Sequence, residues 1–263
     1  MPLSDARDGH WALVTGATGG LGIEFCKLLS ARGYRLIITG RNTDKLAQIR
    51  EEIEQVEMAL AGDLTDPICL ANLIKTLKEN DIKLEVLINN AGFGLYGETL
   101  KQPASDNINL IDLNIRTLTA LTLAIAREMK VRGSGYILNV ASIAAFMPCP
   151  SLGIYAASKS YVLSFSEALH EELKTSGVHV TALCPGPVKT GFWHRAGVNE
   201  NNHFEFAFTG ARAVAQCGLN ALFANKTVVT YGWINKILVL TAQIAPRFLV
   251  RLIAKKVLAA LKN

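Results

Sequence analysis

A tyrosine and a lysine stand four residues apart in the stretch YAASK, at Tyr155 and Lys159. On a helix, residues at i and i+4 share a face, so this spacing would bring a phenol and an ammonium group together. A free tyrosine has a pKa of about 10, which is too high for proton exchange near neutral pH. A cation about 4 Å away, at an effective dielectric constant near 20, could supply the roughly 4 kcal/mol that lowers it by about 3 units, although burial opposes this. We interpret the pair as a proton-transfer couple, although the same spacing occurs by chance on ordinary helix surfaces.

A glycine-rich segment, TGATGGLG at residues 15–22, ends the first apolar run of the chain. Within it Gly16, Gly20 and Gly22 give the pattern G-x-x-x-G-x-G. Glycines at a strand–helix turn let a pyrophosphate approach the backbone, and the helix that follows offers free N–H groups at its positive end. A glycine-rich turn alone is weak evidence, but its position between a first strand and a first helix predicts a dinucleotide site.

The second apolar run ends in ITGRN, residues 38–42, and indicates which dinucleotide is bound. A cofactor without a 2′-phosphate usually meets an Asp or Glu about 20 residues after the glycines. Here that point holds Gly40 followed by Arg41. A guanidinium pairs with a phosphate through two parallel hydrogen bonds. The sequence therefore favours NADP(H) over NAD(H), the alternative being that Arg41 is a solvated loop residue.

The elements that must position these residues are short apolar runs alternating with helix-like stretches. Strands are expected over residues 11–16, 35–40, 57–61, 84–92, 135–142, 179–186 and 227–232. Helices are expected over residues 20–32, 43–54, 67–79, 105–131, 154–175 and 211–224. The strands are apolar throughout, as in sheets covered on both faces, and strand–helix alternation gives parallel pairing. We predict an α/β fold, a Rossmann-type doubly wound parallel seven-stranded sheet with helices on both faces, as one domain over residues 1–263, with ligands at the carboxyl ends of the strands.

Composition narrows the class of protein. The chain has 263 residues, 50% of them hydrophobic and 19% charged, which suits a large buried core. Its five cysteines are scattered without metal-ligand spacing, so we predict reduced thiols and no metal site. The first ten residues lack the apolar segment of a secretory signal, and no apolar run reaches the roughly 18 residues of a membrane span. We therefore expect a cytoplasmic location.

Charge is unevenly distributed along the chain. The net charge is +5, no Asp or Glu follows Glu205, and residues 206–263 carry eight Lys and Arg residues, which leaves 5 − 8 = −3 for the rest. A nucleic-acid-binding domain would be basic throughout, so we predict no nucleic-acid partner.

Further motifs follow in order: GDLTD at 62–66, NNAG at 89–92, LN at 113–114, Ser142, and PGPVKT at 185–190. With the glycine-rich turn and YAASK they make seven ordered motifs over residues 11–190, and Ser142 stands thirteen residues before Tyr155. In this set the chain resembles the short-chain dehydrogenase/reductase family. The resemblance implies an NADP(H)-dependent oxidoreductase of carbonyl and alcohol substrates that forms a homodimer or homotetramer through the 105–131 and 154–175 helices.

The resemblance also implies a role for each matched residue. Tyr155 would be the general acid in carbonyl reduction and Ser142 would hydrogen-bond the substrate oxygen. Lys159 would bind the nicotinamide ribose and lower the tyrosine pKa, and Asn114 would hold a water linked to Lys159. Asp63 would contact the adenine, Asn90 would lie beside the adenosine half, and Gly186 and Thr190 would hold the nicotinamide end. The implied cofactor-binding set is Gly16, Thr18, Gly20, Leu21, Gly22, Arg41, Asp63, Leu64, Asn90, Ala91, Gly92, Tyr155, Lys159, Pro185, Gly186, Val188 and Thr190. Asn90 could instead be purely structural.

Beyond Thr190 the resemblance is loose. We expect a substrate region over residues 191–226, whose aromatic stretch 191–208 could form a lid with Phe192, Trp193, Phe204 and Phe206 against an apolar substrate. Simple surface packing explains the same aromatics equally well.

Residues 233–263 form a basic amphipathic C-terminal extension. Pro246 can start its second helix, along which Arg247, Arg251 and Lys255 recur every four residues among apolar side chains. The extension could pack against another subunit, cover a substrate site, or make peripheral contact with an anionic membrane. We place the first two ahead of the third.

The sequence supports an NADPH-dependent oxidoreductase that interconverts a carbonyl and a secondary alcohol on an apolar substrate. One alternative is a catalytically silent dinucleotide-binding sensor or interaction protein. Another is a 3-oxoacyl or hydroxysteroid type of reductase at a membrane surface, and the fold also supports reactions such as epimerisation or dehydration.

Overall fold

The computed structural model describes residues 10–191 and 209–260 of the chain. The expected lid contacts Phe192, Trp193, Phe204 and Phe206 lie outside the described residues.

Seven parallel strands form one sheet in the order β3-β2-β1-β4-β5-β6-β7, which confirms the predicted topology. The strand order reverses direction between β1 and β4, which is where a doubly wound sheet opens a crevice for its ligand. The strands are β1 Trp11–Thr15, β2 Arg35–Gly40, β3 Val56–Ala61, β4 Leu84–Asn89, β5 Gly135–Val140, β6 Val178–Leu183 and β7 Val228–Val229.

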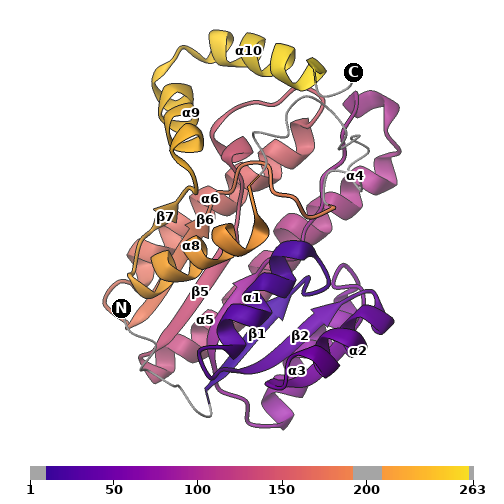
Figure 1. Cartoon of the computed structure of the whole chain (residues 1–263), viewed down its shortest axis with the longest axis vertical. Helices are drawn as coiled ribbons and strands as arrows, with labels where there is room; N and C mark the ends of the chain where they lie inside the picture. The colour runs from indigo at the N-terminus through magenta and orange to yellow at the C-terminus, as the bar shows by residue number, and fades with distance from the viewer. Residues whose placement is uncertain (1–9, 192–208, 261–263) are drawn as a thin grey trace.

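Helices cover both faces of the sheet. They are α1 Gly20–Ser30, α2 Thr43–Glu52, α3 Pro67–Glu79, α4 Ala104–Ile111, α5 Leu118–Arg132, α6 Gly153–Leu173, α8 Ala211–Phe223, α9 Trp233–Ile244 and α10 Arg247–Ala260. One core layer joins the sheet to α1, α2 and α8, and a second joins it to α3, α5 and α6. In Figure 1, α1 and α8 lie in front of the strands. Every residue of β4 is buried, because both layers cover it.

Local signals in the sequence set several helix ends. Asn42 caps α2 by accepting a hydrogen bond from the Lys45 amide at 2.8 Å. Asp66 caps α3 in the same way, ahead of a proline at the first helical position. Gly133, with φ of 75°, ends α5 in the left-handed conformation that glycine adopts without strain.

The predicted single helix over 105–131 is wrong in one respect. A π-helical turn, Asp112–Thr117, separates α4 from α5, and Asn114 lies inside it. Hydrophobic periodicity does not reveal such a turn, because one extra residue barely changes the apolar pattern. By length and composition the combined segment Ala104–Arg132 could cross a membrane. Its residues Leu121, Ile125 and Met129 are buried in the second core layer, as in a core helix of a globular domain.

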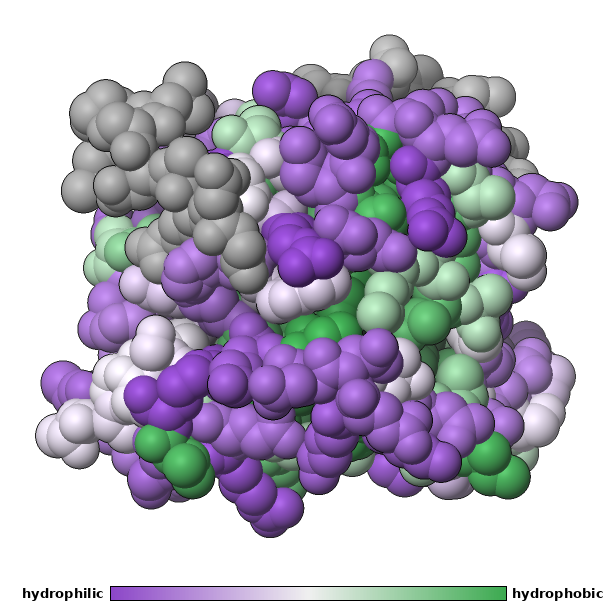
Figure 2. All heavy atoms as spheres, turned by 90° about the horizontal axis from the view of Figure 1, so that it is seen from below, coloured by the Kyte–Doolittle hydropathy of each residue, from purple (hydrophilic) through white to green (hydrophobic). Residues whose placement is uncertain are grey.

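The C-terminal helices extend beyond the sheet. Figure 1 shows α9 rising from the body of the molecule and α10 crossing at its top. Figure 2 views the opposite end, from below, where hydrophilic residues predominate and hydrophobic ones gather in a band through the centre. The two helices therefore sit at one end of the domain rather than against a sheet face.

Candidate active site

A cavity of about 580 Å³ lies at the carboxyl ends of the strands. Its lining includes every residue that the sequence implied for the cofactor, together with Ser142. Asn114 is the one implied residue that does not line it in the described structure. The sequence-predicted residues are thus brought together at one place, and their chemical roles remain proposals.

The glycine-rich turn forms the floor of one half of this cavity. Gly16 has φ of +63°, and a Cβ on Gly22 would come within 2.3 Å of the Gly16 carbonyl oxygen. The N-terminus of α1 has no side-chain cap and no acidic residue in its first turn. Its amide groups and positive dipole end therefore face the cavity without competition from a carboxylate. The turn can approach an anionic group such as a pyrophosphate closely.

Asn90 holds this turn against the loop after β4. Its amide nitrogen donates to the carbonyl oxygens of Thr15 and Gly16, each at 3.0 Å. Its backbone N–H donates to the Thr15 hydroxyl at 3.0 Å. These bonds support a structural role for Asn90, because both hydrogen bonds that its amide nitrogen donates go to the glycine-rich turn. Asn90 also lines the cavity, so it both holds the turn and forms part of the cavity wall.

We expect Gly22→Ala to disrupt this cradle. The added methyl group would meet backbone atoms of Gly16 and Ala17 at 2.3 Å and 2.8 Å, which side chains cannot relieve. Overpacking of this kind costs roughly 1–3 kcal/mol, and a displaced turn should also weaken NADPH binding by at least about tenfold. Thermal denaturation and NADPH fluorescence titration measure the two effects.

Gly210→Ala is the matched control for that substitution. A Cβ there meets nothing within 4 Å, and the backbone does not need positive φ. It should leave NADPH affinity close to wild type and cost no more than about 1 kcal/mol of stability, because Gly210 is the N-cap of α8, where alanine is less favourable. If Gly22→Ala behaved like Gly210→Ala, the close packing described for the turn would be refuted.

Tyr155 and Lys159 lie on the first two turns of α6, next to Ser142 at the end of β5. All three side chains are buried, at 8%, 5% and 8% exposure. The Lys159 Nζ lies 5.8 Å from the centre of the Tyr155 ring and donates a hydrogen bond to the Val140 carbonyl oxygen at 2.7 Å. The helix thus delivers the phenol and the ammonium group to one place, as the i, i+4 spacing predicted.

Burial dominates the protonation of this pair. It raises the pKa of Tyr155 to about 12, and a hydrogen bond with Ser142 opposes the rise. It lowers the pKa of Lys159 to about 8. The net lowering of the tyrosine pKa expected from the sequence is not found in this structure, because desolvation of the phenol outweighs the hydrogen bond with Ser142. The phenol is protonated at neutral pH and can act as an acid, while the lysine titrates close to neutrality.

Asn114 braces the site from behind. Its amide nitrogen donates to the Phe93 carbonyl oxygen and to the Ser158 hydroxyl, both at 3.0 Å, and its Oδ1 accepts from the Phe93 N–H at 3.1 Å. Ser158 in turn donates to the Tyr155 carbonyl oxygen at 2.7 Å. The π-helical turn therefore fixes the loop after β4 and the start of α6 together.

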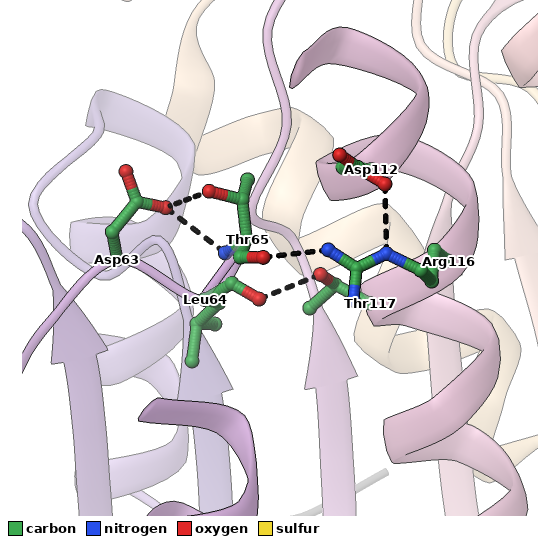
Figure 3. A network of polar contacts seen from close by, with 6 residues as sticks. All are labelled: Asp63, Leu64, Thr65, Asp112, Arg116 and Thr117. Carbon is green, nitrogen blue, oxygen red and sulfur yellow. Dashed lines mark hydrogen bonds and ion pairs between the residues drawn. The ribbon is translucent and has the colours of Figure 1, made fainter. Parts of the chain in front are cut away.

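A second network links the same turn to the loop after β3 (Figure 3). Arg116 donates to Asp112 at 2.7 Å and to the Thr65 carbonyl oxygen at 2.6 Å. Thr117 donates to the Leu64 carbonyl oxygen at 2.7 Å, and Asp63 accepts from the Thr65 amide and hydroxyl. The network holds Asp63 and Leu64 at the cavity wall, so this loop is positioned by the turn that carries Asn114.

Arg41 and Asp63 mark the mouth of the cavity. The guanidinium Nη1 lies 3.9 Å from a carboxylate oxygen of Asp63, and the two side chains are 64% and 48% exposed. Exposed pairs of this kind contribute little to stability, so Arg41 can turn toward a ligand phosphate at small cost.

The other half of the cavity is apolar and comes from the segment before α6 and from the C-terminal extension, for which covering a substrate site was one of the predicted roles. Its walls include Met147, Cys149 and Leu152 from the segment before α6. Side chains of α9 and α10 complete it: Ile234, Asn235, Leu238, Thr241, Ala242, Val250, Ile253, Ala254, Val257 and Leu258. The Tyr96 hydroxyl donates to the Leu258 carbonyl oxygen at 2.7 Å and ties α10 down. The spacing of Val250, Ala254 and Leu258 is the signal that could have shown this face.

The described residues contain no cluster of His, Cys, Asp or Glu able to hold a metal ion. Burial raises the pKa of the Cys149 thiol to about 11, so that group is a packing residue at neutral pH rather than a thiolate nucleophile.

Comparison with known proteins places this geometry in context. A family profile described as short chain dehydrogenase matches residues 10–201. A "Probable NADP-dependent dehydrogenase" of Haemophilus influenzae is 36% identical over 176 residues, covering 66% of this chain and 70% of that protein. The "Very-long-chain 3-oxoacyl-CoA reductase" of Mus musculus is 33% identical over 190 residues, covering 70% of this chain and 61% of the reductase, so the chain matches less than two thirds of that relative.

Solved structures agree. A short-chain dehydrogenase from Sphingobium yanoikuyae in complex with NADPH matches with a TM-score of 0.79 and 32% identity, covering 85% of this chain and 88% of that one. A bulky-bulky ketone specific alcohol dehydrogenase from Comamonas testosteroni matches with a TM-score of 0.75 and 26% identity, covering 89% and 92%.

Proposed function

The chain belongs to the short-chain dehydrogenase family, and from that premise we propose that it is an NADPH-dependent oxidoreductase that interconverts an apolar ketone and its secondary alcohol. The observation that carries the proposal is one continuous cavity at the carboxyl ends of the strands. It joins a glycine cradle, a buried Ser142–Tyr155–Lys159 group and an apolar compartment under α9 and α10.

The residues present fit a nicotinamide dinucleotide phosphate. Gly16, Gly20 and Gly22 line the cavity and pack too closely on neighbouring residues to take a side chain without displacement, so the turn presents bare backbone to a pyrophosphate, and the uncapped α1 terminus favours its charge. Arg41 at the cavity mouth suits the 2′-phosphate. The relative from Haemophilus influenzae and the Sphingobium yanoikuyae structure carry the same cofactor type in their names.

When bound, the cofactor supplies the hydride that reduces the carbonyl carbon. The chain's own residues handle the proton and the carbonyl oxygen. Ser142 donates a hydrogen bond to that oxygen, and Tyr155, whose pKa is held at about 12 by burial, transfers its proton to it. Hydride and proton together give the alcohol.

Lys159 returns the proton to Tyr155. Its pKa of about 8 lets it give up a proton near neutral pH, and a phenolate formed nearby would be stabilised by the ammonium group. The hydrogen bond from Nζ to the Val140 carbonyl oxygen fixes the lysine at the end of β5, beside Gly92 and Asn114. These features support the proposal that the lysine is the second member of a proton relay.

The substrate is proposed to be apolar and bulky. The substrate half of the cavity is lined by Met147, Leu152, Leu238, Val250 and Leu258. The names of two relatives, a very-long-chain 3-oxoacyl-CoA reductase and a bulky-bulky ketone specific dehydrogenase, point in the same direction. NADPH oxidation measured across ketones and 3-oxoacyl thioesters of increasing chain length tests this. Rates should rise with apolar size, and equal rates for acetone-sized and long-chain ketones would contradict it.

Arg41→Gln should change cofactor preference without removing turnover. Losing the charged hydrogen bonds to a 2′-phosphate, worth roughly 1.5–3 kcal/mol, should lower the NADPH-over-NADH ratio of kcat/KM by about 10–100-fold. Arg50→Gln, an exposed substitution on α2 that does not line the cavity, is the control. An unchanged ratio in Arg41→Gln would show that Arg41 is only a solvated loop residue.

A further inference from the structure

The C-terminal helices expose an unusual amount of apolar surface. Of seventeen large apolar side chains exposed in the described part of the chain, eleven lie between residues 233 and 257. Scattered exposed apolar residues are normal, but a contiguous group of this kind on a globular protein marks a surface that something covers.

On α9 the exposed group is an ordered stripe. Trp233, Ile237, Leu240 and Ile244 are 71%, 54%, 56% and 76% exposed. Their spacing of i, i+4, i+7 and i+11 puts them on one side of the helix. None of the four lines the cavity, whose wall is formed by other residues of α9. The stripe is therefore not explained by the active site.

On α10 apolar and basic side chains share the outer surface. Phe248 and Leu252, 55% and 57% exposed, are one turn apart and two residues from the buried Val250 and Ala254, so they point nearly away from the cavity. A row of exposed basic residues flanks them: Arg247, Arg251 and Lys255. An apolar strip bordered by cations is the composition of a helix that lies in the interface of a bilayer.

The charge of α9 and α10 distinguishes between two partners for this surface, a second copy of the chain and an anionic lipid bilayer. No Asp or Glu follows Glu205, so α9 and α10 carry Lys236, Arg247, Arg251, Lys255 and Lys256 without an acidic partner on either helix. A second copy docked face to face would bring these cations together, which is repulsive. An anionic surface instead gains attraction from every one of them.

We infer that the outer face of α9 and α10 docks on an anionic lipid bilayer. The residues of these helices that face inward line the apolar half of the cavity, so docking places that compartment next to the lipid phase. If the proposed function holds, the bilayer is also the source of the apolar substrate. The docking itself rests on the exposed face and not on turnover.

Sedimentation with vesicles tests the inference. The full chain should sediment with vesicles of phosphatidylcholine mixed with phosphatidylserine, bind at least about tenfold more weakly to phosphatidylcholine alone, and be released by high salt. Two triple variants should each lose at least about tenfold in binding: Trp233→Ser/Ile237→Ser/Ile244→Ser and Arg247→Glu/Arg251→Glu/Lys255→Glu.

A third variant is the matched control. Lys27→Glu/Lys45→Glu/Arg50→Glu changes net charge equally at exposed sites on α1 and α2, and should still bind. Binding lost equally in this control would overturn the assignment of the face. So would a wild-type chain that stays in the supernatant, or one that self-associates through this face in sedimentation-velocity runs without lipid.

Activity separates this inference from the proposed function. NADPH oxidation with a small soluble ketone should survive the apolar triple variant, because none of its residues lines the cavity. Vesicle binding without any turnover would contradict the proposed function and leave bilayer docking supported. Turnover without vesicle binding would contradict bilayer docking and leave the proposed function supported.

Discussion

Replacing Tyr155 with phenylalanine is expected to lower kcat by roughly 10²–10⁴-fold while NADPH affinity stays close to wild type. The substitution removes only the hydroxyl, and the ring keeps its place in the cluster with Leu110, Cys149, Leu152 and Ala156. Steady-state kinetics with a bulky ketone and fluorescence titration with NADPH measure the two quantities. The reason for the large loss is that the proposed mechanism takes the proton for the carbonyl oxygen from this hydroxyl, and a phenyl ring has no proton to give.

Tyr161→Phe is the control for that experiment. Tyr161 lies on the same helix, is 37% exposed, and its hydroxyl is 2.8 Å from the hydroxyl of Thr119, away from the cavity lining. Its kcat should be unchanged. A Tyr155→Phe protein that turned over as fast as Tyr161→Phe would show that the proton comes from elsewhere.

Lys159→Met should remove activity and a pH-dependent part of the stability together. Losing the lysine should lower kcat at least about 100-fold, because the tyrosine is no longer re-protonated from within the site. The pKa of Lys159 is about 8 in the folded chain against an ordinary value of 10.5. Between those pH values the unfolded chain binds more protons, so this group makes stability rise with pH through the window.

The size and sign of that rise are measurable. A shift of this extent corresponds to about 3 kcal/mol across the full window. Tyr155 acts in the opposite sense above pH 10, because its folded pKa of about 12 exceeds the ordinary value of 10.0. The buried thiols of Cys26, Cys149 and Cys184, whose pKa values burial raises above the ordinary 9.0, act in the same sense as Tyr155. The lysine is therefore isolated by comparing variants in chemical denaturation between pH 8 and about pH 10. Lys159→Met should lose the lysine's upward contribution to the slope, whereas Lys174→Met, an exposed site at the end of α6, should keep it. Equal slopes in both variants would contradict burial of the ammonium group.

Much of this fold follows from local patterns in the chain. The strands are continuous apolar runs, α2 and α3 carry their own N-caps, and parallel pairing follows from the alternation. The glycine turn, Ser142 and the YAASK helix all end at the same edge of the sheet, so their meeting was predictable once the topology was known. Even the structural option for Asn90 was visible as an alternative.

Other features depended on packing that one sequence does not display. The π-helical turn at Asp112–Thr117 leaves no mark on the apolar pattern. Val250 and Ala254 form the inward face of α10. In the sequence they do not differ from other apolar residues of an amphipathic helix, so only the packing of α10 against the cavity identifies them. The direction of the Tyr155 shift was missed because the depth of burial, and not the i, i+4 spacing, decides it. The dimer or tetramer stays a prediction.

The most direct test of the account is transfer of label from NADPH that carries deuterium at its reactive C4 position to a bulky, apolar ketone. We expect an alcohol with deuterium at the carbinol carbon, formed by the wild-type chain and by Tyr161→Phe but not by Tyr155→Phe. An alcohol without the label, or no product from the wild-type chain across the ketone series despite tight NADPH binding, would contradict it.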